Sequence, residues 1–322
     1  MITNLYVEFT KRFSKNGEHR QKLNLLKELK KKYPKDEELN KLITAFRQKI
    51  YGSKGAGFIH EKVAELFENR FPFQNRILEI EGVKFDLTSN SAREVFYDEL
   101  IDLLCSDVFF GKSEEHKKIH QLVVDCQFVR EGPYQYQDVF LNPNDVLIDI
   151  GANMGIFSLL ANKFYNCKSY AFEPIKSTVN LLNKNIALNG MEQFIEVVPY
   201  ALSNEECDVE FQIDQDNMGA SSFVRTPKKC KKSEKIHCLS LDQWVNKNHI
   251  SKIDFIKADI EGAERYMLSG ATEVLQKFAP KLSICTYHLP DDPQVLEEII
   301  LKANPKYKVV HAYKKLFAAV VK

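Results

Sequence analysis

The stretch that most constrains the fold is "LIDIGANMGIFSLLA", residues 147–161. It reads as a buried apolar strand, a turn with two glycines and a helix. Glycine lets the backbone approach a ligand closely and adopt positive φ, and asparagine is among the few other residues that tolerate this conformation. The stretch therefore predicts an α/β unit with a ligand bound at the turn.

From about residue 136 apolar strands alternate with helical segments. The strands are "VLIDI" (146–150), "SYAF" (169–172), "FIEVV" (194–198), "IDFIKAD" (253–259) and "KLSICTY" (281–287). Such strands, separated by helices, indicate a parallel sheet covered on both faces. At the end of the chain "YKVVHAY" and "LFAAVV" have only Lys314 and Lys315 between them, which predicts an antiparallel hairpin at the sheet edge. The expected fold is thus α/β, with five parallel strands and a terminal hairpin.

The pattern divides the chain into three predicted segments. Residues 1–75 show helical spacing and form a helical N-terminal arm, and residues 76–135 form a lead-in subdomain. In the lead-in, "ILEIEGVKFDL" (77–87) predicts a hairpin that turns at Glu81 and Gly82, and "AREVFYDELIDLL" (92–104) predicts an amphipathic helix. Residues 136–322 hold the alternating strands and helices.

Composition excludes several classes of partner and location. Lys and Arg number 45 against 44 Asp and Glu, so the net charge of +1 does not favour a nucleic-acid partner. The first 50 residues carry 13 Lys or Arg and 6 Asp or Glu, an excess of +7, which indicates a solvated face, with an acidic partner as the alternative. The helical arm is also where copies of the chain could associate. Seven scattered cysteines without a C-x-x-C pair predict neither disulfides nor a zinc site and favour a cytoplasmic location. No apolar run approaches the roughly 18 residues of a transmembrane segment.

The turn at residues 149–155 selects among ligands. A dinucleotide fingerprint G-x-G-x-x-G would need glycine where the chain has Asn153 and Ile156. The stretch fits D-x-G-x-N-x-G instead, with Asp149, Gly151, Asn153 and Gly155. Glu173, 22 residues after Gly151, ends the second strand and is placed to accept the hydroxyls of a ribose. A ribose and a small zwitterion at a helix N-terminus, without a pyrophosphate cradle, predict S-adenosylmethionine.

Residues 136–322 resemble the FkbM family of S-adenosylmethionine-dependent methyltransferases. The similarity rests on "DVLIDIGANMGIFSLLA", "AFEP", "SLDQW" and "DFIKADIEGAERYMLSGATEVL", followed by "PKLSICTYH". The resemblance implies the Rossmann-like sheet of class I methyltransferases, with seven strands and a reversed last strand. It places Ala201 where the chain turns past the adenine ring. Ala258 departs from the branched aliphatic residue usual in that motif. The similarity is weak over 77–135 and absent from the helical arm.

Three residues after the fourth and fifth strands are the candidate catalytic residues. His288 is the first choice as general base, because its ordinary pKa near 6.5 suits proton abstraction at neutral pH; the alternative is a histidine that only caps the strand. Asp259 and Glu261 are expected to accept hydrogen bonds from substrate or cofactor, or else to cap the helix that begins near Ala263. Glu264 is assigned to the first turn of that helix. One carboxylate pair is too little to predict a metal, and none is predicted.

These observations favour an O-methyltransferase that acts on a small-molecule or glycan hydroxyl, and the resemblance implies a sugar or sugar-bearing acceptor. An NAD-linked oxidoreductase and a non-catalytic scaffold that binds partners through the arm remain alternatives. Two further segments have open interpretations. "DQDNMGASSF" (214–223) forms either part of an acceptor pocket or a β-turn. "HKKIH" (116–120) has a zinc-like spacing but fits a solvated helix face better.

Overall fold

The computed structural model describes residues 68, 72–103, 131–214, 224 and 230–320. The chain divides into two compact units, Met1–Glu65 and Leu66–Lys322, and every described residue lies in the second. The predicted lead-in subdomain and the predicted methyltransferase domain both fall in this second unit. Most of the helical arm, the 116–120 segment and residues 215–223 of the polar insertion lie outside the described residues.

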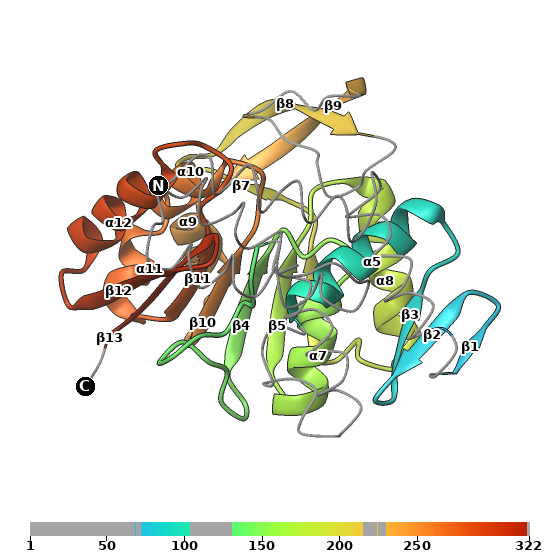
Figure 1. Ribbon diagram of the computed structural model, residues 1–322. Helices are drawn as coiled ribbons and strands as arrows, with labels where there is room; N and C mark the ends of the chain where they lie inside the picture. Colours follow the sequence, from blue (N-terminus) through green and yellow to red (C-terminus); the bar gives the residue numbers. More distant parts are fainter. Residues whose placement is uncertain (1–67, 69–71, 104–130, 215–223, 225–229, 321–322) are drawn as a thin grey trace, which may run out of the picture. The chain divides into compact units, whose positions relative to one another are not determined.

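A seven-stranded sheet forms the centre of the second unit (Figure 1). Its strand order is β12-β13-β11-β10-β4-β5-β6. Neighbouring strands are parallel except for β13, which runs antiparallel to both β11 and β12. The strands are β4 (Val146–Ile150), β5 (Lys168–Phe172), β6 (Ile195–Val198), β10 (Phe255–Ala258), β11 (Lys281–Cys285), β12 (Tyr307–Ala312) and β13 (Lys315–Val320). The predicted parallel strands and terminal hairpin are confirmed.

The turn of the terminal hairpin differs from the prediction by one residue. Lys315 is not in the turn: it begins β13 opposite Ala312, and Tyr313 takes the positive φ of 57°. Lys315 is 1% exposed, and its ammonium donates a hydrogen bond of 2.7 Å to the carbonyl of Gly132. The same ammonium lies 4.4 Å from the centre of the Tyr134 ring. A lysine that looks like a turn residue in the sequence is therefore held inside by a carbonyl and an aromatic face.

Helices cover both faces of the sheet. Because alternate strand residues point to opposite faces, Ile148, Ile256 and Ile284 join one core with the helices after β9. Those helices are α9 (Leu241–Lys247), α10 (Glu264–Ser269), α11 (Thr272–Lys277) and α12 (Asp292–Ala303). On the other face Phe255 contacts Phe157 of α7 (Ile156–Tyr165), with ring centres 6.1 Å apart. Helix α8 (Lys176–Leu188) follows β5 and ends before Gly190, as its sequence indicates.

The lead-in hairpin and helix pack beside α7 and α8. The hairpin strands are β2 (Ile77–Ile80) and β3 (Val83–Asp86), and the helix is α5 (Asn90–Leu103). A third strand, β1 (Phe73–Gln74), pairs with β2 and corrects the helical prediction for the end of residues 1–75. Glu81 and Gly82 form the predicted turn, both with positive φ. Asn185 of α8 accepts a 2.8 Å hydrogen bond from the backbone N–H of Asp86. This contact fastens the hairpin to the helical layer on the α7 face.

Besides the sheet of β1, β2 and β3, a further three-stranded sheet lies at the end of the large sheet where the parallel strands terminate (Figure 1). Its order is β7 (Ala201–Leu202), β9 (Cys230–Leu239) and β8 (Cys207–Asp214). Strands β8 and β9 pair antiparallel along their length, so the polar insertion leaves from a β-hairpin. Through β7 and β8 this small sheet supplies one wall of the candidate site.

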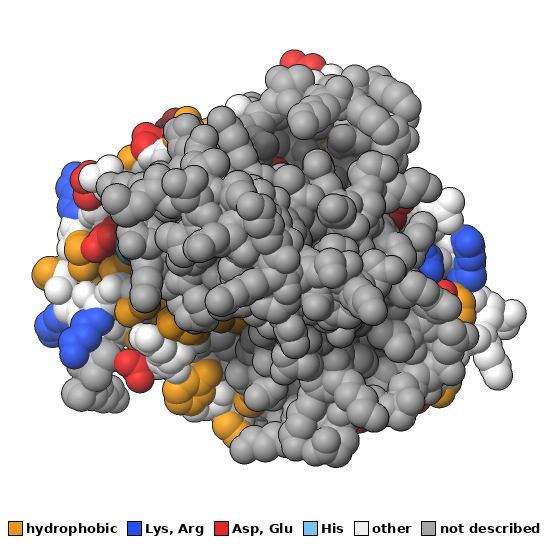
Figure 2. All heavy atoms as spheres, viewed as in Figure 1, with side chains coloured by type: hydrophobic (Ala, Val, Ile, Leu, Met, Phe, Trp, Pro, Cys, Tyr) orange, Lys and Arg blue, Asp and Glu red, His pale blue; other side chains and the backbone are white. Residues whose placement is uncertain are grey.

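The described surface carries mixed charges. Figure 2 shows acidic and basic side chains interspersed with apolar ones along the left border of the view. This distribution agrees with the near balance of 45 basic and 44 acidic residues in the whole chain. Among the described helices, none has the length and apolar character of a membrane-spanning segment.

Candidate functional site

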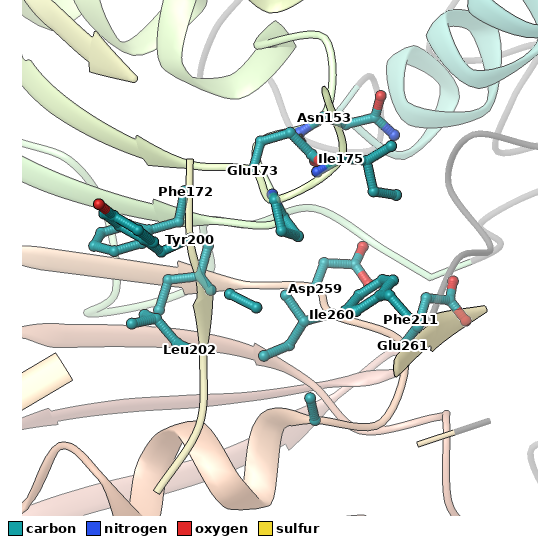
Figure 3. Close-up of a pocket in the computed structure, with 15 residues that line it drawn as sticks. Asn153, Phe172, Glu173, Ile175, Tyr200, Leu202, Phe211, Asp259, Ile260 and Glu261 are labelled. Atoms are coloured by element: carbon teal, nitrogen blue, oxygen red, sulfur yellow. Dashed lines mark hydrogen bonds between the residues drawn. The ribbon is translucent and has the colours of Figure 1, made fainter. Parts of the chain in front are cut away.

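A cavity opens at the carboxyl ends of β4, β5 and β10, between the large sheet and the small one (Figure 3). Together with its open mouth, it spans about 560 Å³ of space between the protein atoms. Open parallel sheets bind ligands at this edge, beyond the carboxyl ends of their strands. Of the nine predicted site residues, Gly151, Asn153, Glu173, Ala201, Asp259 and Glu261 line the cavity.

The turn after β4 is shaped by glycine. Gly151 has φ of +74°, and a Cβ placed on it would lie 2.0 Å from the carbonyl oxygen of Asp259. The backbone after β4 and the backbone after β10 therefore run against each other at the cavity floor. Gly155 caps α7 with φ of +87°, and a Cβ there would meet Leu182 of α8 at 2.5 Å. Gly155 thus serves close helix packing and does not line the cavity.

Glu173 projects from the end of β5 into the cavity (Figure 3). One carboxylate oxygen accepts a 3.0 Å hydrogen bond from the backbone N–H of Ile175, and the other accepts one of 3.1 Å from Asn153. Burial raises the pKa of Glu173 to about 7, against the opposing effect of these two donors. The side chain is fixed in place, yet its carboxylate lacks a neighbouring cation in direct contact among the described residues.

The remaining walls near Glu173 are mainly apolar. Tyr200, Ala201 and Leu202 line one side, and Phe211 of β8 lies on the small sheet. Asn153 faces the same space, and its side-chain Oδ1 is buried without a hydrogen-bond partner among the described residues. Apolar walls, a fixed carboxylate and an unsatisfied amide oxygen suit a ligand with an aromatic ring, hydroxyls and an ammonium group.

Asp149 lies one layer beneath the cavity. Its carboxylate accepts a 2.7 Å hydrogen bond from the Ser158 hydroxyl and pairs with the Lys257 ammonium at 3.1 Å. Lys257 also donates a 2.8 Å hydrogen bond to the carbonyl of Gly151. Burial alone would lower the pKa of Lys257, but the charge of Asp149 raises it above the ordinary value, so the ammonium stays charged. Asp149 therefore reaches the turn through Lys257 and does not face the cavity.

The loop after β10 presents two carboxylates. Asp259 accepts hydrogen bonds from the hydroxyls of Tyr134, at 2.8 Å, and Tyr287, at 3.3 Å. Burial would raise the pKa of Asp259, but the positive charges of His288 and the buried lysines lower it to about 2. Glu261 has φ of +56°, an uncommon conformation for a residue with a side chain. In Figure 3 both carboxylates lie across the cavity from Asn153 and Glu173.

His288 follows β11 and lies behind the two carboxylates. Its Nε2 is 3.6 Å from Asp259 and 3.8 Å from Glu261, too far for hydrogen bonds. On the other side of the ring, Nδ1 is 2.9 Å from the Glu264 carboxylate. Burial would lower the pKa of His288, but Glu264, Asp259 and Glu261 together raise it to about 9. The imidazole is therefore protonated at neutral pH as long as no charged ligand occupies the cavity.

Asp259, Glu264 and His288 each place one possible cation ligand within 4.8 Å of the others. Both oxygens of Asp259 already accept tyrosine hydroxyl hydrogen bonds. Both oxygens of Glu264 accept hydrogen bonds from backbone N–H groups, at Ile260 and Gly262. Contacts among protein groups, including the 2.9 Å approach of His288 to Glu264, account for the cluster, and no cation is assigned to it.

Sequence reasoning missed four residues that organise the site: Lys257, Tyr134, Tyr287 and the wider role of Glu264. One signal for Lys257 is visible in the sequence. "VLIDI" and "FIKA" are both apolar strands with a single charge, and in the observed register Asp149 stands directly opposite Lys257. Opposite charges at the same level of adjacent buried strands indicate an ion pair. Tyr134 leaves no comparable signal, since it comes from a segment outside the strands.

The strand order, the reversed β13 and the cavity at the carboxyl ends of β4, β5 and β10 define the Rossmann-like fold of class I methyltransferases. Residues 149–308 match the model of the methyltransferase FkbM domain. The resemblance seen in the sequence is confirmed, and the chain carries an FkbM methyltransferase domain.

Two curated relatives carry methyltransferase names. The chain is 27% identical over 161 residues to the hexuronic acid methyltransferase AglP of Haloferax volcanii, a match that covers 50% of this chain and 63% of AglP. It is 24% identical over 181 residues to the methyltransferase sdnD of Sordaria araneosa, covering 44% of this chain and 70% of sdnD. A solved FkbM methyltransferase from Methylobacillus flagellatus is 17% identical, with a TM-score of 0.44 over 71% of this chain and 60% of that one. The match to AglP thus spans less than two thirds of that relative.

Proposed function

We propose that the protein transfers a methyl group from S-adenosylmethionine to a hydroxyl of a sugar or sugar-bearing acceptor. The observation that carries the proposal is a single cavity with two chemically different sides. One side has a backbone-held carboxylate, Glu173, beside a glycine turn and an apolar slot. The other side has Asp259 and Glu261 with His288 behind them.

Each predicted cofactor-binding residue has a role in this proposal. Glu173 accepts the ribose hydroxyls, the backbone at Ala201 and its apolar neighbours hold the adenine ring, and the turn from Gly151 to Asn153 receives the amino-acid end. Gly155 opens the helix N-terminus behind this turn. Asp149 acts on the cofactor side indirectly. It pairs with Lys257, and Lys257 donates a hydrogen bond to the Gly151 carbonyl. When bound, S-adenosylmethionine supplies an electrophilic methyl group on a positively charged sulfur.

On the acceptor side the chain must align a hydroxyl and remove its proton. Alignment contributes roughly 7–11 kcal/mol to such a reaction, whereas one general base adds about 10²- to 10⁴-fold in rate. Asp259 and Glu261 accept hydrogen bonds from the acceptor. His288 Nε2 would take the proton of the acceptor hydroxyl, and the methyl group would come from S-adenosylmethionine held on the cofactor side. The positive charge of bound S-adenosylmethionine would disfavour imidazolium and so bring His288 toward its basic form.

The acceptor class is supported by a relative and not by the cavity alone. The curated name of AglP gives hexuronic acid as what that protein methylates. A sugar hydroxyl needs both alignment and a base, and the carboxylates and histidine of this site provide for both. The first acceptors to screen are therefore uronic acids and their glycosides, followed by neutral sugars. The cytoplasmic location and an oligomer formed through the helical arm stay predictions from the sequence.

Replacing Glu173 by glutamine is expected to weaken S-adenosylhomocysteine binding about 10- to 100-fold. Hydrogen bonds to a charged group contribute about 1.5–3 kcal/mol, and the amide nitrogen of glutamine would face a backbone N–H where the carboxylate accepted one. Calorimetry on wild type and E173Q measures the change. The matched control is E196Q, an exposed glutamate on the neighbouring strand β6, which should bind like wild type. If E173Q binds S-adenosylhomocysteine as tightly as wild type, Glu173 does not contact the cofactor. If wild type does not bind S-adenosylhomocysteine, the proposed function is wrong.

Cofactor binding should also depend on pH through Glu173. Its pKa of about 7 means that the carboxyl group is mostly protonated at pH 6 in the empty protein. The ribose hydroxyls bind the ionised form, so affinity should rise about fivefold between pH 6 and pH 7, by about a further twofold up to pH 8, and level off above. Calorimetric titrations with S-adenosylhomocysteine from pH 5.5 to 8 test this. E173Q should lose the dependence, and a pH-independent wild-type affinity would contradict the assignment.

A further inference from the structure

Glu264 makes more contacts than a first-turn helix residue requires. It begins α10, is fully buried, and accepts hydrogen bonds from the backbone N–H groups of Ile260, at 2.9 Å, and Gly262, at 3.0 Å. The same carboxylate lies 2.9 Å from His288 Nδ1. One side chain therefore ties three points together: the two ends of the peptide that carries Glu261, and the imidazole after β11.

We propose that Glu264 is a positioning residue of the acceptor site, which fixes the His288 ring and the loop of Asp259 and Glu261 relative to each other. The inference rests on the proposed function and names a residue that this function does not itself require. Contact through Nδ1 leaves Nε2 as the ring nitrogen that faces Asp259 and Glu261. A carboxylate behind a histidine holds its orientation and stabilises the protonated ring that forms when a hydroxyl is deprotonated.

Arg265, the residue after Glu264, holds the turn that follows His288 at a second point. Arg265 pairs with Asp291 at 2.8 Å and with Asp292 at 2.5 Å, and Asp292 accepts a hydrogen bond from the backbone N–H of Leu289. The turn after His288 is thus fastened to α10 independently of Glu264. Loss of the Glu264 carboxylate should release the ring and the loop while the turn itself remains anchored.

The groups that face His288 are known from each neighbouring element. Asp259 and Glu261 approach from the loop after β10, Glu264 approaches from α10, and the Tyr287 ring lies 4.0 Å away, centre to centre. Of these, Glu264 is the nearest carboxylate. Its neutralisation should therefore lower the pKa of His288 more than neutralisation of Glu261.

The test compares E264Q with wild type by NMR of protein labelled with ¹⁵N-histidine. The His288 signals are identified by their loss in H288Q. We expect His288 of wild type to titrate near pH 9, and that of E264Q to titrate at least one pH unit lower with an altered tautomer ratio. The control is E297Q, whose glutamate pairs with the exposed His311 at 2.7 Å and should change only the His311 signals. An unchanged His288 titration in E264Q would overturn the proposal.

A second variant covers the case in which E264Q does not fold. E264D keeps the charge but shortens the side chain by one methylene, so it cannot reach His288 and both N–H groups together. We expect an altered His288 tautomer ratio in E264D, and a wild-type ratio would overturn the proposal. The NMR readout needs neither cofactor nor acceptor. Failure of the proposed function would appear separately, as absent S-adenosylhomocysteine binding in wild type.

Discussion

Replacing Lys257 by methionine is expected to lower the free energy of unfolding by about 3–5 kcal/mol, the cost typical of breaking a buried ion pair from one side. Lys257 is 2% exposed and Asp149 is fully buried, and their charged groups lie 3.1 Å apart. Methionine fills a similar volume but leaves the Asp149 carboxylate with only the Ser158 hydroxyl. It also removes the donor to the Gly151 carbonyl. Urea denaturation followed by circular dichroism measures the difference.

Two further variants isolate the cause of that loss. Lys252 also pairs with an aspartate, Asp254, at 2.9 Å, but its side chain is 55% exposed, so K252M should cost at most about 1 kcal/mol. Adding D149N to K257M removes the uncompensated charge and should restore part of the stability. A K257M protein within 1 kcal/mol of wild type would show that water or another group compensates Asp149.

The large sheet was predictable because each strand is short, apolar and separated from the next by a clear helix. "VLIDI" and β4 coincide at residues 146–150, and the other parallel strands differ from their predicted bounds by one to two residues at an end. The terminal hairpin was predictable because only a short connection separates its two apolar strands, but the bounds of its turn were not. Lysines ordinarily mark a turn, and only the Gly132 carbonyl and the Tyr134 ring make burial of Lys315 favourable.

The part of the candidate site that the sheet topology positions, at the ends of β4 and β5, was predictable from the sequence. Gly151, Asn153 and Glu173 follow β4 and β5, and strand ends in a parallel sheet meet at one edge, so their convergence follows from the topology. Interactions that depend on side chains from separate segments were not predictable. Nothing in the spacing of Glu264 and His288 shows that a helix start and a strand end place them 2.9 Å apart.

The same limit applies to the chemistry of His288. An isolated histidine has a pKa near 6.5 and looks like a ready base at neutral pH. Three carboxylates from two other segments raise that pKa to about 9. His288 can therefore act as the proposed base only when a positively charged ligand in the cavity lowers its pKa. This dependence joins the two sides of the cavity, because the cofactor's positive charge would prepare the base that the acceptor needs.

Replacing Gly151 by alanine is expected to weaken S-adenosylhomocysteine binding at least about 100-fold, or roughly 2.7 kcal/mol. The new methyl group would lie 2.0 Å from the carbonyl oxygen of Asp259, and the φ of +74° is unfavourable for any residue with a side chain. The backbone must therefore move at the point where the turn after β4 meets the loop after β10. Both sides of the cavity are displaced together, so the loss should exceed that of E173Q.

Gly190 provides the matched control for this variant. Its φ is +63°, close to that of Gly151, but a Cβ there would meet nothing within 4 Å. G190A therefore carries the same kind of backbone strain, about 1–2 kcal/mol of stability, and should bind S-adenosylhomocysteine like wild type. Calorimetry and thermal unfolding on both variants separate strain from contact. If G151A and G190A lose affinity equally, strain alone accounts for the effect; if G151A binds like wild type, the turn at Gly151 does not hold the cofactor.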